Sequence, residues 1–326
     1  MDPFVHTVSR GFTYSYIRIP PSSSPPKPNI LFLHGFPSIA LEWHNQIEYL
    51  RGKGFGVIAP DLLGYGKTSR PIDPVHYRFK DICQDVIEIL DYEKVDVVLG
   101  VAHDMGVGIL SRLDFYFPQR ISKLALLATG YHPPGAVVDL EAANASFEKS
   151  LGYSLYGYMK FFIEDSEAVE ILNNHHSSFS SLMYANDPAL WRNYLAPIGA
   201  LKKWLQNDKQ AEIGPWISPA YRAARDEAFT KDGGYTAPLN WYRCLVNNMN
   251  LQDEPEDECK TFRSAHPVLL VLAEKDAIVL PSLQLEATKP WVKDLTVKQV
   301  PTGHWPMAEA SEKVNQELGN FFGDID

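Results

Sequence analysis

A single aspartate stands where a buried strand is expected to turn abruptly into a helix, in segment 95–110, "VDVVLGVAHDMGVGIL". The frame Ala102-His103-Asp104-Met105-Gly106 has the order small–x–nucleophile–x–small of a nucleophile elbow. Small flanking residues suit such a turn, because the central residue is strained and its neighbours pack closely. We therefore interpret Asp104 as a nucleophile. The alternative is a plain helix cap, since aspartate tolerates positive φ and often caps helices.

Two segments nearer the C-terminus supply partner groups in the chain order nucleophile, acid, histidine. His304 in "GHWPMAE" lies in a loop between the last predicted strand and the last predicted helix, which makes it a candidate base. Asp276 follows the apolar run of "VLLVLAEKDAIV" and precedes His304 by 28 residues. We interpret Asp276 as the acid that orients the base, and its neighbour Glu274 as a packing or hydrogen-bonding residue.

The segment "HGFP", residues 34–37, follows an early buried strand. In this arrangement the loop after that strand supplies one donor of an oxyanion hole, and the residue after the nucleophile supplies the other. We expect the backbone N–H groups of Phe36 and Met105 to form this pair.

A carboxylate nucleophile restricts the chemistry. Its attack on saturated carbon gives an ester, which a histidine-activated water can cleave, whereas a serine would give an inert ether. Asp104 therefore predicts an epoxide or an alkyl halide as substrate. A departing halide needs N–H donors, which the side chain of Met105 lacks. An epoxide oxygen needs a proton donor such as tyrosine, whose reference pKa is about 10.

Composition limits the alternatives. The chain has 326 residues, 45% of them apolar, enough for a large core. A net charge of −10 weighs against nucleic acid or an anionic membrane as the main partner. We expect no membrane span and no signal peptide, because no long apolar run occurs and the N-terminus is polar. Cys83, Cys244 and Cys259 form no CxxC pair, which favours a cytoplasmic protein without a metal site or other cofactor.

Strand-like and helical patterns alternate along the first part of the chain. Apolar runs such as "NILFLHGFP" and "VDVVLGVA" are separated by helical spacing, as in "RFKDICQDVIEILDYEK". This alternation predicts an α/β fold with a parallel sheet covered on both faces. Residues 133–258 are helical in pattern and aromatic-rich. We predict a core of residues 1–132 and 259–326 and a helical insertion of 133–258, whose acidic run "DEPEDE" (253–258) is a solvated connector.

Taken in order, the motifs "HGFP", "PDLLGYGKTSRP", "AHDMG", "GGYTAPLNWYR", "LAEKD" and "GHWPMAE" resemble those of the soluble epoxide hydrolases of the α/β-hydrolase fold, across essentially the whole chain. The resemblance implies a mostly parallel central sheet flanked by helices, with a lid inserted after the sixth strand. It also implies Asp104 as nucleophile, His304 as base and Asp276 as its orienting acid. The substrate implied is a small-molecule epoxide.

The resemblance extends to tyrosines of the lid that hold the epoxide oxygen. Tyr242 in "PLNWYR" matches one of them. We assign the other to Tyr158 in "GYMKFF", with Tyr153 and Tyr156 as neighbouring alternatives. One departure lies at the elbow, where the family usually has tryptophan and this chain has Met105, which implies an altered pocket wall.

We expect an apolar pocket, because the insertion carries the aromatic residues Phe161, Phe162, Trp191, Trp204 and Trp241. Six residues are expected to contribute to the substrate pocket: His34, Pro37, His103, Tyr153, Trp241 and Trp305. The leading hypothesis is hydrolysis of an epoxide to a vicinal diol. Alternatives are an epoxide-opening cyclase with the same site, a haloalkane dehalogenase, and a ligand-binding protein. The sequence leaves the oligomeric state open, a dimer included.

Overall fold

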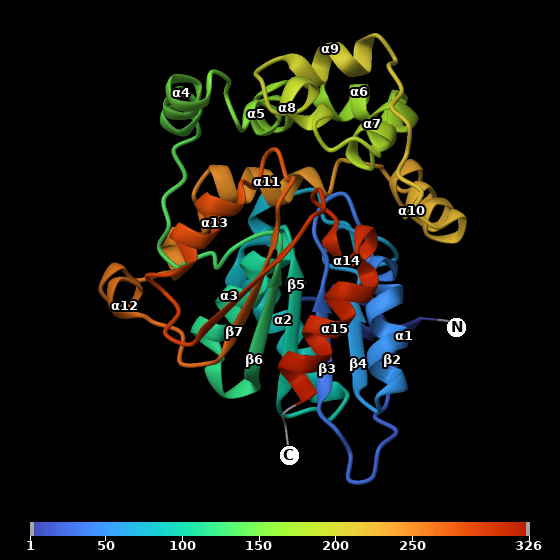
Figure 1. Ribbon diagram of the computed structural model, residues 1–326, viewed down its shortest axis with the longest axis vertical. Coiled ribbons are helices and arrows are strands. Elements are labelled where there is room, and N and C mark those ends of the chain that lie inside the picture. Colours follow the sequence, from blue (N-terminus) through green and yellow to red (C-terminus); the bar gives the residue numbers. More distant parts are fainter. Residues whose placement is uncertain (1–2, 324–326) are drawn as a thin grey trace.

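The computed structural model describes residues 3–323. Its eight strands form one sheet (Figure 1). The strand order is β1-β2-β4-β3-β5-β6-β7-β8. β1 and β2 pair antiparallel, as do β2 and β4, and the remaining pairs are parallel. The strands are β1 Phe4–Thr7, β2 Thr13–Ile19, β3 Asn29–Leu33, β4 Gly56–Pro60, β5 Val98–His103, β6 Ile121–Leu127, β7 Val268–Ala273 and β8 Leu295–Val300. The predicted α/β fold with a mostly parallel sheet is confirmed.

The burial of each strand follows its place in the sheet. All residues of β4, β5 and β7 are buried, because helices cover the inner strands on both faces. This explains their uninterrupted apolar runs. The edge strand β8 carries the mixed sequence "LTVKQV" and keeps several residues exposed.

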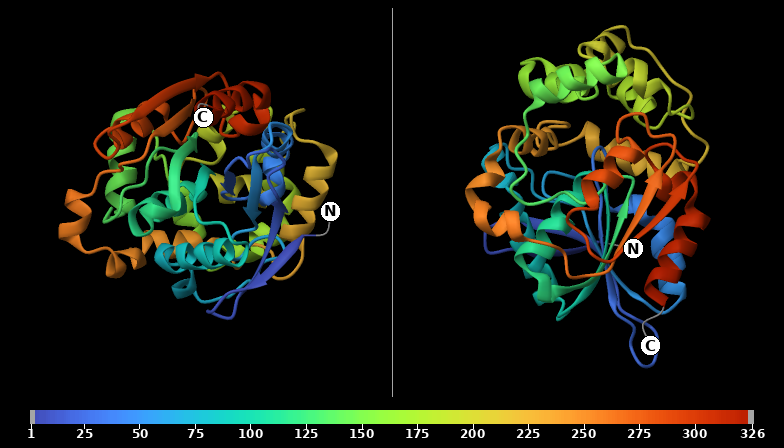
Figure 2. Two further views of the ribbon diagram at one scale, coloured as in Figure 1. Left: turned by 90° about the horizontal axis from the view of Figure 1, so that it is seen from below. Right: turned by 60° about the vertical axis from the view of Figure 1, so that its left-hand side comes forward.

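Helices flank the sheet on both faces. α1 (His44–Gly52) packs with α15 (Ser311–Gly323) on one face, and α2 (Phe79–Tyr92) packs with α3 (Met105–Tyr116) on the other (Figure 2). α2 buries Ile82, Val86, Ile89 and Leu90, the residues whose helical spacing is visible in the sequence. Shorter helical turns are η1 Ala40–Trp43, η2 Pro74–Tyr77, η3 Pro118–Arg120, α13 Pro281–Thr288 and α14 Pro306–Glu309.

The segment between β6 and β7 contains helices and no strand of the sheet. It lies over one end of the sheet (Figure 1). Its helices are α4 Leu140–Leu151, α5 Gly157–Glu164, α6 Ala168–Asn174, α7 His176–Met183, α8 Leu190–Tyr194, α9 Ala200–Gln206, α10 Pro219–Thr230, α11 Leu239–Val246, η4 Met249–Asp253 and α12 Glu256–Thr261. The boundaries at 133 and 258 stay a prediction, and α12 runs across the second.

The acidic run at 253–258 differs in part from the prediction of a solvated connector. Glu256, Asp257 and Glu258 are exposed, but Glu254 is buried. Its carboxylate pairs with the buried Arg112 at 2.8 Å, so the chain exit of the insertion is held by an internal ion pair.

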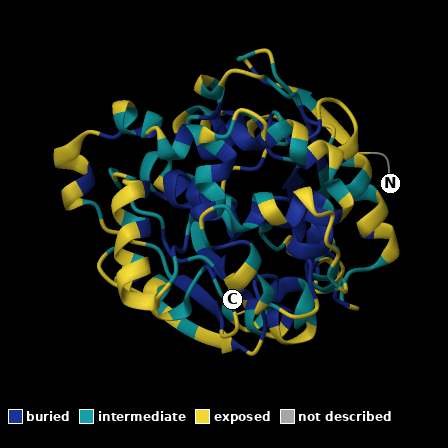
Figure 3. Ribbon diagram, turned by 90° about the horizontal axis from the view of Figure 1, so that it is seen from above, coloured by how far each residue is buried: buried dark blue, intermediate teal, exposed yellow. Residues whose placement is uncertain are grey.

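Seen from above the insertion, exposed residues lie mainly along the periphery and buried ones toward the middle (Figure 3). Within residues 3–323 no helix is both long and apolar enough to cross a membrane. The same described part contains no cluster of three or more His, Cys, Asp or Glu side chains able to hold a metal ion.

Candidate active site

Asp104 occupies the sharp turn between β5 and α3, with φ 49° and ψ −125°. This backbone conformation is strained for a residue with a side chain. Close packing explains the small neighbours. A Cβ on Gly106 would lie 2.3 Å from the carbonyl oxygen of Leu33, and a Cβ on Gly35 would lie 2.4 Å from the Cβ of Asp104. The turn therefore tolerates little bulk on either side of the carboxylate.

Loops at the carboxyl ends of three parallel strands bring Asp104, Asp276 and His304 together. They follow β5, β7 and β8 respectively. Nδ1 of His304 lies 2.6 Å from Oδ2 of Asp276, and Nε2 lies 3.6 Å from Oδ2 of Asp104. Oδ1 of Asp276 accepts hydrogen bonds from the backbone N–H groups of Ile278 and Val279, at 3.0 and 2.9 Å. His304 thus lies between two carboxylates, and both oxygens of the Asp276 carboxylate already have hydrogen-bond partners.

The backbone N–H of Phe36 donates to Oδ1 of Asp104 at 2.9 Å. Phe36 belongs to the "HGFP" loop, where the sequence predicts an oxyanion donor. Among the described hydrogen bonds, the N–H of Met105 makes none to this carboxylate. One member of the predicted pair is therefore in contact with Asp104, while the role of the other stays a prediction.

The charges of the three groups depend on one another. Burial opposes the charged form of His304, but the carboxylates of Asp276 and Asp104 outweigh it and raise the pKa of His304 to about 10. Burial also acts to raise the pKa of Asp104, yet the hydrogen bond and charge of His304 bring it below the usual value. The resting site therefore holds an ionised Asp104 beside an imidazolium.

Tyr158 of α5 and Tyr242 of α11 line one cavity together with Asp104 and His304. Their rings meet edge to face, with centroids 6.2 Å apart. Burial, followed by the negative charge of Asp104, raises the pKa of both hydroxyls well above 10. Both tyrosines are therefore protonated and can donate a hydrogen bond toward a molecule held against Asp104.

Residues 28–311 match the family model described as alpha/beta hydrolase fold. The chain belongs to the α/β hydrolase fold family. It is 27% identical to the epoxide hydrolase srdG of Neurospora crassa, over 98% of this chain and 94% of that protein. It is also 27% identical to the bifunctional epoxide hydrolase 2 of Mus musculus, covering 89% of this chain but only 51% of that longer relative.

Among solved structures, epoxide hydrolase A from Mycobacterium thermoresistibile superposes with a TM-score of 0.82 over 99% of both chains, at 22% identity. This likeness concerns the fold. It agrees with the sheet order and with the helical segment between β6 and β7 of this α/β hydrolase.

Two other tyrosines near α5 do not line the cavity with Asp104. The hydroxyl of Tyr153 lies 3.4 Å from the carbonyl of Ala277, and the guanidinium of Arg192 covers its ring. Tyr156 packs edge to face on Phe147. Tyr158 is thus the tyrosine of this segment that lines the cavity with Asp104, whereas Tyr153 lies outside its lining and its contribution to a substrate pocket stays a prediction.

The other expected pocket residues are also absent from the lining of this cavity. Their polar atoms are used by the fold: His34 Nε2 accepts from the N–H of Leu62, the Pro37 carbonyl accepts from Tyr184, His103 Nε2 bonds the His304 carbonyl, and the indoles of Trp241 and Trp305 donate to the carbonyls of Leu63 and Met183. Four of these contacts are made by side chains and that of Pro37 by its backbone carbonyl, and all five connect parts of the fold around the site.

Six further apolar residues line the cavity. They are Phe162, Met183, Trp191, Leu195, Ile278 and Val279. The aromatic content of the insertion pointed to Phe162 and Trp191, but Phe161, Trp204 and Trp241 carried the same signal and do not line the cavity. Aromatic composition therefore predicts an apolar wall without identifying its members.

The cavity beside Asp104 is nearly closed, with a volume of about 20 Å³. A cavity of roughly 10–15 Å³ on this measure holds about one water molecule. An organic substrate therefore requires the helical segment or the side chains of the wall to move apart.

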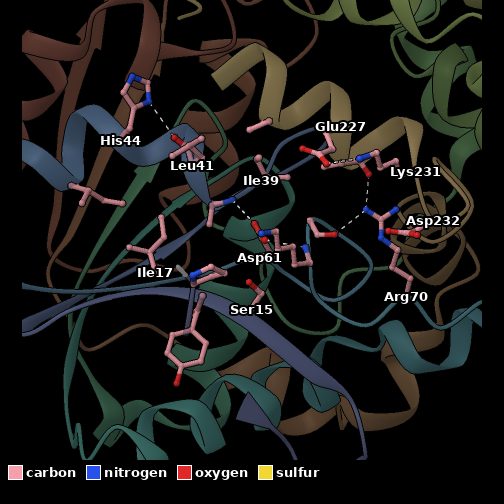
Figure 4. Close-up of a pocket in the computed structure, with 18 of the residues that line it drawn as sticks. Ser15, Ile17, Ile39, Leu41, His44, Asp61, Arg70, Glu227, Lys231 and Asp232 are labelled. Atoms are coloured by element: carbon pink, nitrogen blue, oxygen red, sulfur yellow. Dashed lines mark hydrogen bonds and ion pairs between the residues drawn. The ribbon is translucent and has the colours of Figure 1, made fainter. Parts of the chain in front are cut away.

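A larger hollow of about 510 Å³ lies elsewhere, between β2, the start of α1 and helix α10 (Figure 4). Asp61 there accepts from the N–H of Ala40 at 2.9 Å. Arg70 donates to the carbonyls of Gly66 and Ala228. Arg70 thus connects the core to α10. The lining of this larger hollow includes none of the residues that line the Asp104 cavity.

Proposed function

We propose that this α/β hydrolase is an epoxide hydrolase that converts an epoxide to a vicinal diol through an ester on Asp104. One observation carries the proposal: a carboxylate with a free oxygen, a histidine and two protonated tyrosines share one apolar cavity. The carboxylates differ in availability. Both oxygens of Asp276 are bound, whereas Oδ2 of Asp104 has only the 3.6 Å contact with His304.

In the first step, Oδ2 of Asp104 attacks a ring carbon and the carbon–oxygen bond of the epoxide breaks. The departing oxygen takes a proton from Tyr158 or Tyr242, so a free alkoxide is avoided. The phenolate left behind recovers its proton from the imidazolium of His304. The products of this step are an alkyl ester on Asp104 and a neutral imidazole.

Ester formation itself prepares the second step. It removes the negative charge of Asp104, one of the two carboxylates that raise the pKa of His304. Neutral His304, oriented by Asp276, then takes a proton from water, whose oxygen attacks the ester carbonyl. The Phe36 N–H donates to the oxyanion that forms on Asp104. Collapse of this intermediate breaks the bond between the carbonyl carbon and the alkyl oxygen, and that oxygen takes the proton of the newly added hydroxyl. The diol leaves, Asp104 is again a carboxylate and His304 an imidazolium, so one water is added per epoxide.

The N–H groups of the cavity weigh against halide release. Trp191 lines the cavity, but its indole N–H donates to the carbonyl of Leu182 at 2.8 Å. The side chain of Met105 offers none. Hydroxyl donors at Tyr158 and Tyr242 suit an epoxide oxygen better than a halide.

We extend the proposal to the arrangement of the chain. Residues 133–258 act as a lid over a core formed by 1–132 and 259–326, and substrate entry requires the lid to open. The three cysteines are free and buried, which supports a cytoplasmic location.

The covalent intermediate gives the direct test. With a panel of aryl and alkyl epoxides, His304→Gln accumulates an adduct whose intact mass exceeds that of the protein by the mass of the epoxide. Asp104→Asn forms none, because the amide is not nucleophilic. An adduct that persists in Asp104→Asn, or a His304→Gln protein without adduct while the unaltered enzyme turns over, contradicts the proposal.

A single turnover in ¹⁸O-labelled water distinguishes hydrolysis from cyclisation. With enzyme in excess, hydrolysis places the label in the peptide that contains Asp104, because water attacks the ester carbonyl. An internal hydroxyl that opens the epoxide instead gives an unlabelled cyclic product and an unlabelled Asp104.

A further inference from the structure

Two buried polar atoms without hydrogen-bond partners face each other next to the site. They are Oε1 of Glu42 and Nδ1 of His103, 4.0 Å apart. Glu42 lies on η1 and is 4% exposed, while His103 is fully buried at the end of β5. A buried polar atom without a partner is destabilising, which favours protonation states that let these two atoms share a hydrogen.

The ring of His103 is neutral and carries its hydrogen on Nε2. This nitrogen lies 2.8 Å from the backbone carbonyl of His304, and a carbonyl oxygen can only accept. Burial and then the charge of His304 lower the pKa of His103 to about 3. Nδ1 therefore presents a lone pair toward Glu42.

Glu42 faces that lone pair as a proton donor. Its Oε2 already accepts a hydrogen bond from the hydroxyl of Ser38. Burial, together with the negative charge of Asp104, raises the pKa of Glu42 to about 8, although the bond from Ser38, the charge of His304 and the backbone N–H of Gly35 act against this rise. A neutral carboxyl group with its hydrogen on Oε1 matches both neighbours, because it accepts from Ser38 and offers its O–H to His103. An ionised carboxylate would turn a second acceptor toward Nδ1.

We propose that Glu42 is a positioning residue: a small movement of its side chain from the 4.0 Å separation lets its carboxyl O–H bind Nδ1 of His103, so that Nε2–H of His103 holds the backbone of His304. The relay fixes the loop that presents the base, and it rests on the proposed function for the role of His304. His103 stacks beside the imidazole of His304, with ring centroids 4.6 Å apart, so the relay acts on both the backbone and the ring.

The relay continues from Glu42 into the helical insertion. The Ser38 hydroxyl lies 2.9 Å from that of Tyr221 on α10, which lies 3.2 Å from the hydroxyl of Tyr184. The guanidinium of Arg225 covers the ring of Tyr184 at 4.1 Å. The position of the insertion is thereby connected to Glu42 through hydroxyl groups.

Ionisation of Glu42 has a defined effect on the site. The titratable and charged groups around it are Asp104, His304, His103, Tyr221, Tyr184 and Arg225. A negative charge on Glu42 stabilises the imidazolium of His304 and removes the O–H that binds His103. Both effects oppose neutral, correctly held His304, so hydrolysis of the ester on Asp104 slows as pH rises above about 8.

The first test reads His103 directly and needs no substrate. The full-length protein is labelled with ¹⁵N-histidine, and its imidazole resonances, with His103 assigned from H103Q, are followed from pH 6 to 10. We expect the Nε2–H form of His103 throughout, with a change at Nδ1 centred near pH 8. In Glu42→Gln the amide N–H₂ still donates, so the tautomer persists and the change disappears. In Glu42→Leu the Nδ1 resonance moves at every pH.

Asp85→Asn is the matched control, because Asp85 is another buried carboxyl whose pKa burial raises, to about 7, and it binds Tyr14 and Arg10 away from the site. It leaves the His103 resonances as in the unaltered protein. An Nδ1 resonance equal in Glu42→Leu and the unaltered protein overturns the proposal, as does a pH change that survives in Glu42→Gln.

The second test measures hydrolysis of the Asp104 ester in single turnovers. Glu42→Leu slows this step at least ten-fold at pH 7 with little effect on KM, and Glu42→Gln recovers most of the loss and removes the decline above pH 8. Equal losses in the two variants at pH 7 overturn the relay. If no epoxide forms an ester in any variant, the proposed function fails, while the histidine resonances still decide the relay.

Discussion

At the scale of single residues, the site holds two kinds of oxygen acid in opposite protonation states. The carboxylate of Asp104 is held at low pKa by His304, while the hydroxyls of Tyr158 and Tyr242 are held at high pKa by burial and by that same carboxylate. The negative charge that the proposed mechanism uses for nucleophilic attack by Asp104 thus also keeps the tyrosines protonated. Each group suits its role because of the others.

Removing one tyrosine hydroxyl tests this division. Tyr158→Phe and Tyr242→Phe each slow formation of the Asp104 ester by about a hundred-fold, the lower end of the range for a positioned proton donor. Rapid-quench mass spectrometry under single-turnover conditions measures the step. Tyr153→Phe is the control, because its hydroxyl points to the Ala277 carbonyl. Equal rates in Tyr242→Phe and Tyr153→Phe would make Tyr242 a packing residue.

Residues fixed by local chain geometry are the ones predictable from sequence. The strand–turn–helix pattern around Asp104 is local, and the loops of His304 and Asp276 directly follow predicted strands. The cavity wall depends on packing between distant segments. Trp241 and Trp191 look alike in the sequence, yet one is packed behind Tyr65 and Tyr77 and the other lines the cavity. No local pattern separates them.

At the scale of elements, both connections of the helical insertion are attached to α3, the helix that begins after Asp104. Arg112 binds the His132 carbonyl on the incoming connection and Glu254 on the outgoing one. Two residues further along α3, the carboxylate of Asp114 binds the hydroxyl of Tyr131 and Nδ1 of His266 in the same way. These two attachments add to the contacts of the insertion near the cavity, where Tyr184 donates to the Pro37 carbonyl and Trp305 donates to the Met183 carbonyl.

Breaking the Arg112–Glu254 pair is expected to be costly. Its side chains are 2% and 1% exposed, so Arg112→Met leaves a buried carboxylate without its partner and lowers the free energy of unfolding by ~3–5 kcal/mol. Urea unfolding measures the loss, and Arg112→Met/Glu254→Leu recovers much of it by removing both charges. Lys231→Met, which breaks an exposed pair with Glu227, serves as control and leaves the midpoint nearly unchanged. A loss as small in Arg112→Met would contradict the role of the pair.

The same elements show why some predictions from sequence failed. The run at 253–258 has the composition of a solvated loop, and nothing local distinguishes Glu254, because its partner Arg112 is 142 residues away. Helix α13 went unpredicted for another reason. Only Thr288 of its residues is buried, so it has no apolar stripe whose spacing could reveal it.

At the scale of the whole molecule, closure and charge act together. The Asp104 cavity has room for about one water, and the groups around it reach their shifted pKa values because water is largely excluded. The proposed opening of residues 133–258 to admit a substrate would therefore also bring these pKa values back toward their usual range. On that proposal, substrate binding and the pKa values of the acid and base are coupled through the position of residues 133–258.

The raised pKa of Glu42 makes the free energy of unfolding depend on pH. The folded protein keeps the Glu42 proton up to about pH 8, whereas the unfolded chain releases it near 4.5. Between these values the folded state binds more protons, so the free energy of unfolding falls with rising pH, by at most ~1.4 kcal/mol per pH unit for this group. His304 adds a decline of the same sign between about 6.5 and 10, because its folded pKa is also raised.

Glu42→Gln removes only the first contribution. Urea unfolding at pH 5, 7 and 9 should therefore show that the free energy of unfolding of Glu42→Gln exceeds that of the unaltered protein by an amount that grows up to about pH 8 and then levels. Parallel pH profiles for the two proteins would mean that Glu42 is ionised in the fold, and the carboxyl O–H that holds His103 would be lost with it.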